Sequence, residues 1–179
     1  MQRILQVHNY YGSSAPSGEN NVVDAERALL KKYGHHVELF ARHSDMIRKN
    51  GVRGKMTGAI STPWNPIAAG ALQAELGHFQ ADIVHAHNTF PLISPSIFKA
   101  ARNHAARVLT LHNYRLFCPA AIPMRSGQIC TTCIDLKTVF PAMRHGCYRE
   151  SRIATAPIAL NVALNRMLGT WRNQVDAFI

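Results

Sequence analysis

Three histidines lie at or near the carboxyl ends of predicted strands, where parallel sheets commonly hold catalytic residues. His85 and His87 fall in the run Asp82–His87 (DIVHAH), and His112 ends the run Val108–His112 (VLTLH). An imidazole at the carboxyl end of a strand can donate a hydrogen bond to a hydroxyl or phosphate group, or accept a proton from a hydroxyl. Catalytic groups collect outside the carboxyl ends of strands in open α/β sheets, so His112 is the first candidate for a catalytic residue.

The same histidines also have structural interpretations. Side chains two residues apart on a strand share a face, so His85 and His87 point together into a crevice or together into packing. We expect no acid near them, and two histidines alone make a poor zinc site. Hydrogen bonding to the neighbouring loop backbone is their alternative role, and His112 has the alternative of a satisfied structural histidine.

Four cysteines form a second candidate site. Cys130 and Cys133 make a C-x-x-C pair, with Cys118 before it and Cys147 after it among turn-forming residues. Four thiolates in this pattern fit a closed, tetrahedral and therefore structural zinc site, in which His145 is a possible replacement for one thiolate. Reduced thiols without metal and disulfides are the alternatives. A redox pair is disfavoured because we expect no helix to open at the C-x-x-C after a strand.

A loop dense in Gly, Ser and Pro follows the first apolar run. Its candidate ligand-binding residues are Gly12, Ser17, Gly18, Glu19 and Asn20. The start of a helix offers unpaired N–H groups and a partial positive charge, and a glycine there lets a diphosphate approach the backbone. The loop lacks the full G-x-G-x-x-G pattern, so a plain strand-to-helix turn is the alternative.

The elements that position these residues alternate over the first 112 residues. We expect strands over residues 3–8, 36–41, 82–87 and 108–112, and helices over residues 19–33, 67–79 and 96–106. The basic stretch 45–56 predicts a surface loop or short helix. Strands alternating with helices predict an α/β fold, with a doubly wound, mostly parallel Rossmann-like sheet and helices on both faces.

The alternation stops over residues 113–151, which hold all four cysteines and predict an insertion. Helical spacing then links five apolar residues: Ile153, Leu160, Leu164, Met167 and Trp171. They predict one amphipathic helix over residues 153–171, with its apolar stripe in the core rather than on a membrane and its start delayed or kinked by Pro157. The final run, residues 175–179, predicts a strand, and such an ending suggests a piece of a longer protein.

The composition of the chain favours some classes of binding partner over others. The 179 residues suit one domain with an insertion, and 20 Lys and Arg against 10 acids give a formal charge of +10. No unbroken basic run occurs, which disfavours a nucleic-acid partner and favours a face toward anionic lipid headgroups or diphosphates. We see no signal peptide and no run of the ~18 apolar residues that a membrane span needs. We expect a cytoplasmic protein that can attach peripherally to the inner membrane face.

Three segments match one family in order and spacing. They are RILQVHNYYG…SGENNVV, ADIVHAHNTFPLISPS, and VLTLHNYRLFCP followed by the cysteine region and GCYRES. Together they resemble the N-terminal domain of the family 4 retaining glycosyltransferases, which have the GT-B fold. The resemblance implies that residues 1–179 are the acceptor-side domain, with insertion 113–151, of a two-domain enzyme whose C-terminal donor-binding domain is absent here.

The resemblance also implies roles for the candidate residues. His112 falls at the reaction centre. The acceptor pocket holds His85, His87 and Asn88. The donor diphosphate loop holds Gly12, Ser17, Gly18, Glu19 and Asn20. Ser17 stands where the family usually has the first glycine of a pair.

Two functions of different classes follow. The first is a hexosyltransferase of polysaccharide biosynthesis, which uses a nucleotide diphosphate-sugar and transfers the hexose with retention to a carbohydrate or lipid-linked acceptor. These 179 residues would be inactive without the donor domain. The alternative is a non-catalytic, zinc-stapled Rossmann-like module that binds an acidic ligand or a partner.

Overall fold

A computed structural model describes residues 1–13 and 17–179. Five strands form one sheet in the order β2-β1-β3-β4-β7, and all neighbours in it are parallel. The strands are β1 (Arg3–Tyr10), β2 (His36–His43), β3 (Ile83–Asn88), β4 (Ala106–Leu109) and β7 (Ala177–Phe178). Parallel neighbours need crossover connections, and the alternating helices of the sequence supply them.

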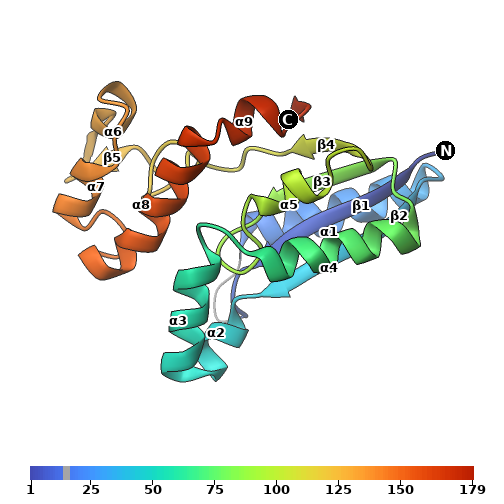
Figure 1. Cartoon of the computed structure of the whole chain (residues 1–179), viewed down its shortest axis with the longest axis horizontal. Coiled ribbons are helices and arrows are strands. Elements are labelled where there is room, and N and C mark those ends of the chain that lie inside the picture. The colour runs from blue at the N-terminus through green and yellow to red at the C-terminus, as the bar shows by residue number, and fades with distance from the viewer. Residues whose placement is uncertain (14–16) are drawn as a thin grey trace.

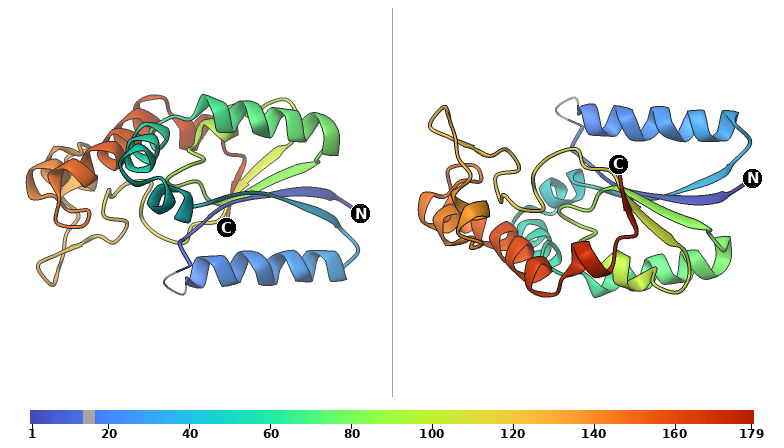
Figure 2. Two further views of the ribbon diagram at one scale, coloured as in Figure 1. Left: turned by 90° about the horizontal axis from the view of Figure 1, so that it is seen from below. Right: turned by 90° about the horizontal axis from the view of Figure 1, so that it is seen from above.

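Helices cover both faces of this sheet. The blue helix α1 (Gly18–Lys32) lies on one face, and α4 (Pro66–Phe79), α5 (Ser96–Ala100) and α9 (Thr170–Asn173) lie on the other (Figure 2). The expected doubly wound, Rossmann-like α/β fold is confirmed.

The two faces of the sheet differ in chemistry. On the α4 side, β1 and β3 contribute apolar side chains to the main core: Leu5, Val7, Val84 and Ala86. On the α1 side, the alternate positions of the same strands are polar: Gln6, His8, His85 and His87, all buried. From α1 itself Val23 is the one buried residue. Polar contacts therefore fill much of the layer between α1 and the sheet.

Two elements end earlier than their sequence patterns predicted. The strand expected to reach His112 ends at Leu109, the last residue in register with both neighbouring strands. His112 consequently lies on the loop after β4. The helix expected over residues 96–106 ends at Ala100, and Asn103 then adopts a left-handed backbone with φ of 68°, which a continuing helix does not allow.

The long C-terminal helix is divided in two. α8 (Arg152–Met167) and α9 are separated at Gly169, whose φ of 61° suits glycine. Pro157 does not delay the start, because Ser151 caps α8 by accepting a hydrogen bond from the Ala154 N–H at 3.2 Å.

The buried side of α8 is not the apolar stripe that spacing predicted. Ile153, Leu160 and Met167 are exposed. The buried positions are Thr155, Ile158, Ala159, Val162 and Asn165. Ile158, Ala159 and Val162 supply the apolar contacts of this side. Thr155 and Asn165 are buried beside them because each hydrogen-bonds within the helix turn, Thr155 to the Ser151 backbone oxygen at 2.7 Å and Asn165 to that of Asn161 at 2.9 Å.

Residues 113–151 lie at the end of the molecule opposite the N-terminus (Figure 1). This insertion contains a hairpin and two short helices: β5 (Met124–Arg125), β6 (Gln128–Ile129), α6 (Thr132–Asp135) and α7 (Phe140–His145). The basic stretch after β2 is helical, as α2 (Asp45–Lys49) and α3 (Gly51–Ser61). In the described part of the chain, every helix is too short or too polar to cross a bilayer.

Candidate active site

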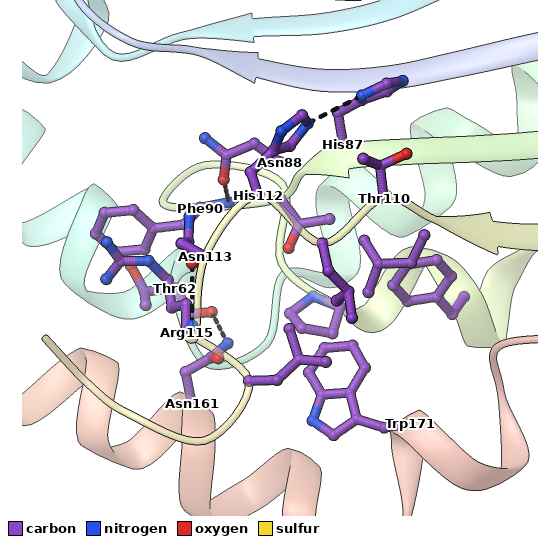
Figure 3. Close-up of a pocket in the computed structure, with 16 residues that line it drawn as sticks. Thr62, His87, Asn88, Phe90, Thr110, His112, Asn113, Arg115, Asn161 and Trp171 are labelled. Carbon is purple, nitrogen blue, oxygen red and sulfur yellow. Dashed lines mark hydrogen bonds between the residues drawn. The ribbon is translucent and has the colours of Figure 1, made fainter. Parts of the chain in front are cut away.

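A pocket opens at the carboxyl ends of β3 and β4 and is closed on its far side by α8 and α9 (Figure 3). His87 and Asn88 reach it from the end of β3, and His112 from the loop after β4. Asn161 and Trp171 line it from the C-terminal helices. Residues far apart in sequence meet here because neighbouring parallel strands end at the same edge of the sheet.

A chain of contacts links His112 to a carboxylate on α1. His87 Nδ1 lies 3.1 Å from His112 Nε2, and His87 Nε2 lies 3.5 Å from Glu26 Oε2. The other oxygen of Glu26 lies 2.8 Å from His85 Nδ1, and His85 Nε2 lies 2.8 Å from the Thr110 hydroxyl. The expectation that no acid lies near these histidines is therefore wrong, because the crossover helix returns Glu26 to them.

Glu26, His85 and His87 also satisfy the spacing of a metal site. Within residues 1–13 and 17–179, theirs is the one group of three or more potential ligands whose atoms lie within 4.8 Å of one another. However, both ring nitrogens of His85 already have partners, and Glu26 Oε1 also accepts a hydrogen bond from Gln6 Nε2 at 3.2 Å. These existing bonds favour a hydrogen-bonded cluster over a metal centre.

Burial and charge set the ionisation of this cluster. Burial by itself would raise the pKa of Glu26, but its contacts with the imidazoles of His85 and His87 outweigh that effect and hold its pKa well below the ordinary value. Burial lowers the pKa of His112, and the carboxylate of Glu19 opposes part of that shift. At neutral pH, therefore, Glu26 at one end of this series of contacts is ionised, and His112 at the other end is neutral.

The start of α1 lies beside these histidines. Ser17 caps the helix, since its Oγ accepts a hydrogen bond from the Asn20 N–H at 3.4 Å. Asn20 Oδ1 lies 2.9 Å from His8 Nε2 and accepts the Tyr11 N–H at 3.3 Å. A Cβ at Gly18 would meet no atom of the described residues within 4 Å, so those residues leave this helix start open to a ligand.

Glu19 connects the helix start to the loop after β4. Its Oε1 accepts a hydrogen bond at 2.8 Å from Nδ2 of Asn113, the residue that directly follows His112 in the sequence. Its Oε2 is buried and finds no hydrogen-bond partner among the described residues. Residues 14–16, which complete the expected diphosphate loop, lie outside the described residues.

Comparison with known families bears on this arrangement. Residues 16–130 match the model of Glycosyltransferase Family 4. The chain belongs to this family. A comparison with curated proteins gives no match. The matched range of this glycosyltransferase domain includes α1, β3 and the loop that carries His112.

Two residues predicted for the glycosyltransferase site have structural partners. Gly12 lies against α2, where a Cβ would collide with the side chains of Arg48 and Asp45. Asn88 lines the pocket, but its amide donates to the Asn9 backbone oxygen at 3.1 Å and accepts the Phe90 N–H at 2.9 Å. Among the expected acceptor residues, His85 lies behind His87 and outside the pocket lining.

The cysteines gather in the insertion, away from the pocket. Cys118, Cys130, Cys133 and Cys147 are all free thiols of intermediate exposure. The expectation that no helix opens at the C-x-x-C is wrong, because α6 begins between the two cysteines, shortly after β6. Both are fragments, a two-residue strand and a four-residue helix, too short for sequence periodicity to mark.

Sequence reasoning missed the residues that reach the site from other elements. Glu26 carried a signal, since it lies seven residues after Glu19 and so on the same side of the helix. Buried polar side chains on a central strand, Gln6 and His8, were a second signal. Nothing in the local sequence of Trp171 marks it as a pocket residue, because α8 and α9 meet the pocket through tertiary packing.

Proposed function

We propose that residues 1–179 form the acceptor-side domain of a retaining hexosyltransferase that uses a nucleotide diphosphate-sugar. The observation that carries the proposal is the contact chain from Glu26 through His87 to His112, which ends in a pocket beside an open helix start. Membership of family 4 supports glycosyl transfer in general. In this proposal the donor-binding domain lies outside these residues.

The contacts from Glu26 through His87 to His112 suggest that His112 is the base that accepts the proton of the acceptor hydroxyl. An ionised Glu26 favours a proton on the nearby Nε2 of His87, which leaves His87 Nδ1 to accept the Nε2–H of His112. Nδ1 of His112, which has no hydrogen-bond partner in the described residues, then keeps its lone pair. In the proposed step the acceptor oxygen bonds to the anomeric carbon, the bond to the diphosphate breaks, and the hydroxyl proton moves to His112.

Other pocket groups suit a sugar acceptor and a diphosphate donor. The indole Nε1 of Trp171 is buried without a partner among the described residues, and can donate to an acceptor hydroxyl. The N–H groups and partial positive charge at the start of α1, next to Gly18, suit the diphosphate.

We extend the proposal to a lipid-linked acceptor at an anionic membrane surface. On α3 the residues Val52, Met56 and Ile60 follow one another at four-residue spacing and are 73%, 59% and 71% exposed. The same helix carries Arg53 and Lys55. An exposed apolar stripe beside cations on a short helix suits an interface with anionic headgroups.

The direct test is turnover of the complete enzyme with and without the His112 imidazole. His112→Ala and His112→Asn should lower kcat by roughly 10²–10⁴-fold, the usual contribution of a general base. His104→Ala, which changes an exposed histidine far from the pocket, should leave turnover unchanged. Product anomers assigned by NMR test retention.

Unchanged turnover in the His112 variants would remove this residue from the mechanism. If the complete protein bound ligands in the pocket but transferred no sugar, the alternative of a non-catalytic binding module would replace the enzyme proposal.

A further inference from the structure

The insertion lacks an apolar core of its own. Over residues 113–151 the buried positions are all small or cyclic: Pro119, Ala121, Ala142 and Gly146. The large apolar side chains are mainly exposed, including Tyr114, Phe117, Ile122, Ile129, Leu136 and Phe140. Burial of apolar area therefore contributes little to its order, and another interaction must hold its two short helices and its hairpin together.

The four thiols come from every part of this insertion. Cys118 lies in a turn closed by the hydrogen bond from the Ala121 N–H at 2.9 Å. Cys130 directly follows the hairpin, and Cys133 lies within α6. Cys147 follows α7, where Gly146 turns the chain with φ of 62°. One centre that binds all four would thus connect the turn, the hairpin and both helices.

Backbone contacts hold the four cysteines in one region. The Cys118 Sγ lies 3.7 Å from the Ile122 backbone oxygen, and the Cys130 N–H donates to the backbone oxygen of the next residue, Pro123, at 2.8 Å. The Cys147 N–H donates at 3.1 Å to the backbone oxygen of Ala142 in α7, and α7 contacts α6, which carries Cys133. Thiolates held in one region repel one another, and a cation between them would reverse that repulsion.

Local charge also suits a tetrathiolate centre. A zinc ion with four thiolates carries a net charge of −2, and residues 113–151 hold five Arg and Lys against two acids.

We propose that Cys118, Cys130, Cys133 and Cys147 bind one structural zinc ion. No three of these four sulfurs lie within 4.8 Å of one another, so in the described structure binding must draw them inward to the roughly 2.3 Å Zn–S distance. Each thiol loses its proton on binding, zinc keeps its oxidation state, and no reductant or oxidant is needed.

The zinc would also order one wall of the proposed acceptor pocket. Arg115 lies three residues before Cys118, and Tyr148 directly follows Cys147. The Arg115 guanidinium stacks 4.5 Å from the centre of the Phe90 ring, and the Tyr148 ring meets Phe90 edge-on at 6.0 Å. Arg115 and Phe90 both line the pocket, so the insertion and the pocket share this contact.

Metal analysis of the purified chain, produced in zinc-supplemented medium, tests the site without any activity assay. We expect about one zinc per chain, and replacement by cobalt(II) should give the visible absorption of a tetrahedral thiolate site. Cys133→Ser should lose at least about tenfold in zinc affinity. His145→Ala should keep its zinc, because the fourth ligand is a thiolate rather than an imidazole.

Wild-type protein without metal, whose four thiols react freely in the native state, would overturn the proposal even if Cys133→Ser failed to fold. Loss of zinc in His145→Ala would overturn the four-thiolate ligand set. Chelation should also speed proteolysis within residues 113–151 by about tenfold or more while the sheet stays intact, and equal cleavage rates would contradict a structural role.

Discussion

The reactivity proposed for His112 depends on partners that hold it in one orientation. Its Nε2 lies 3.1 Å from His87, whose ring is fully buried between His112 and Glu26. An exposed imidazole would rotate between solvent contacts, whereas this one is fixed by a buried neighbour whose own tautomer depends on a carboxylate. Glu26 is therefore a positioning residue. Its removal should change the pKa of His112, although Glu26 itself does not contact the substrate.

Glu26→Gln tests this relation. Loss of the carboxylate charge should lower the pKa of His112, because that charge favours the imidazolium. NMR titration of the histidine ring signals in the 179-residue chain measures the pKa directly. Turnover of the complete enzyme should fall by less than the roughly 10²–10⁴-fold expected for losing His112 itself.

Asp24→Asn is the matched control, because Asp24 lies on the same helix but bonds to Tyr10 rather than to the histidines. If the His112 titration were identical in the wild type and in Glu26→Gln, Glu26 would have no influence on the base.

At the scale of elements, α1 is joined to the sheet through polar contacts. Gln6 and His8 of β1 contact Glu26 and Asn20 of α1 at 3.2 and 2.9 Å, whereas the α4 side is held by an apolar core. Buried polar groups cost free energy unless each finds a partner, and Gln6 Oε1, His8 Nδ1 and His87 Nε2 find no hydrogen-bond partner among the described residues. The bonds that do form fix the orientation of the side chains. This helix therefore contributes more to the precision of the site than to the stability of the fold.

The stability of the chain should fall in mild acid. Burial lowers the pKa of both His8 and His112 below the ordinary 6.5. Below pH 6.5 the unfolded chain takes up these protons first, so stability is full above this pH and is lost as the pH falls toward the folded-state values. Thermal melting between pH 7.5 and 5.5 measures the loss, and each kcal/mol lowers Tm by about 2–4 °C.

A His8→Gln and His112→Asn double variant should lose less Tm over the same interval, because neither replacement titrates. A double variant with the same decline as the wild type would assign the acid sensitivity to other groups.

The whole molecule is strongly basic, with a formal charge of +10. The helix that carries the exposed apolar stripe, α3, lies next to α2 and also contacts α8 (Figure 1). In the proposed membrane contact, charge attracts the protein to an anionic surface, and the apolar stripe then enters the interface. The electrostatic attraction should depend on the lipid composition, whereas the apolar contribution should depend on the side chains of the stripe.

Sedimentation with vesicles of phosphatidylcholine, with or without phosphatidylglycerol, separates the electrostatic from the apolar contribution to binding. We expect binding to the anionic vesicles, and Val52→Ser, Met56→Ser and Ile60→Ser together should weaken it by at least about tenfold. Ile129→Ser removes an even more exposed apolar side chain from the insertion and should have little effect. Equal binding of the triple variant and the wild type would exclude α3 as the membrane contact.

The sequence by itself determined the alternation of strands and helices over the first 112 residues and the edge at which the histidines gather. Apolar runs such as DIVHAH mark buried parallel strands, and parallel strands end at a common edge whatever their neighbours are. Local pattern also placed α1 and α4 within one residue of their observed starts.

Only the tertiary structure decided what surrounds those histidines. Glu26 and Trp171 reach the site through a crossover helix and a C-terminal helix, and which strand end each helix packs against depends on contacts between distant elements. For α8 the apolar spacing even selected the exposed side, since Ile153 and Met167 face solvent while Asn165 is buried. Periodicity reports the average polarity of a helix face, whereas contacts between distant elements depend on how the helices and sheet pack together.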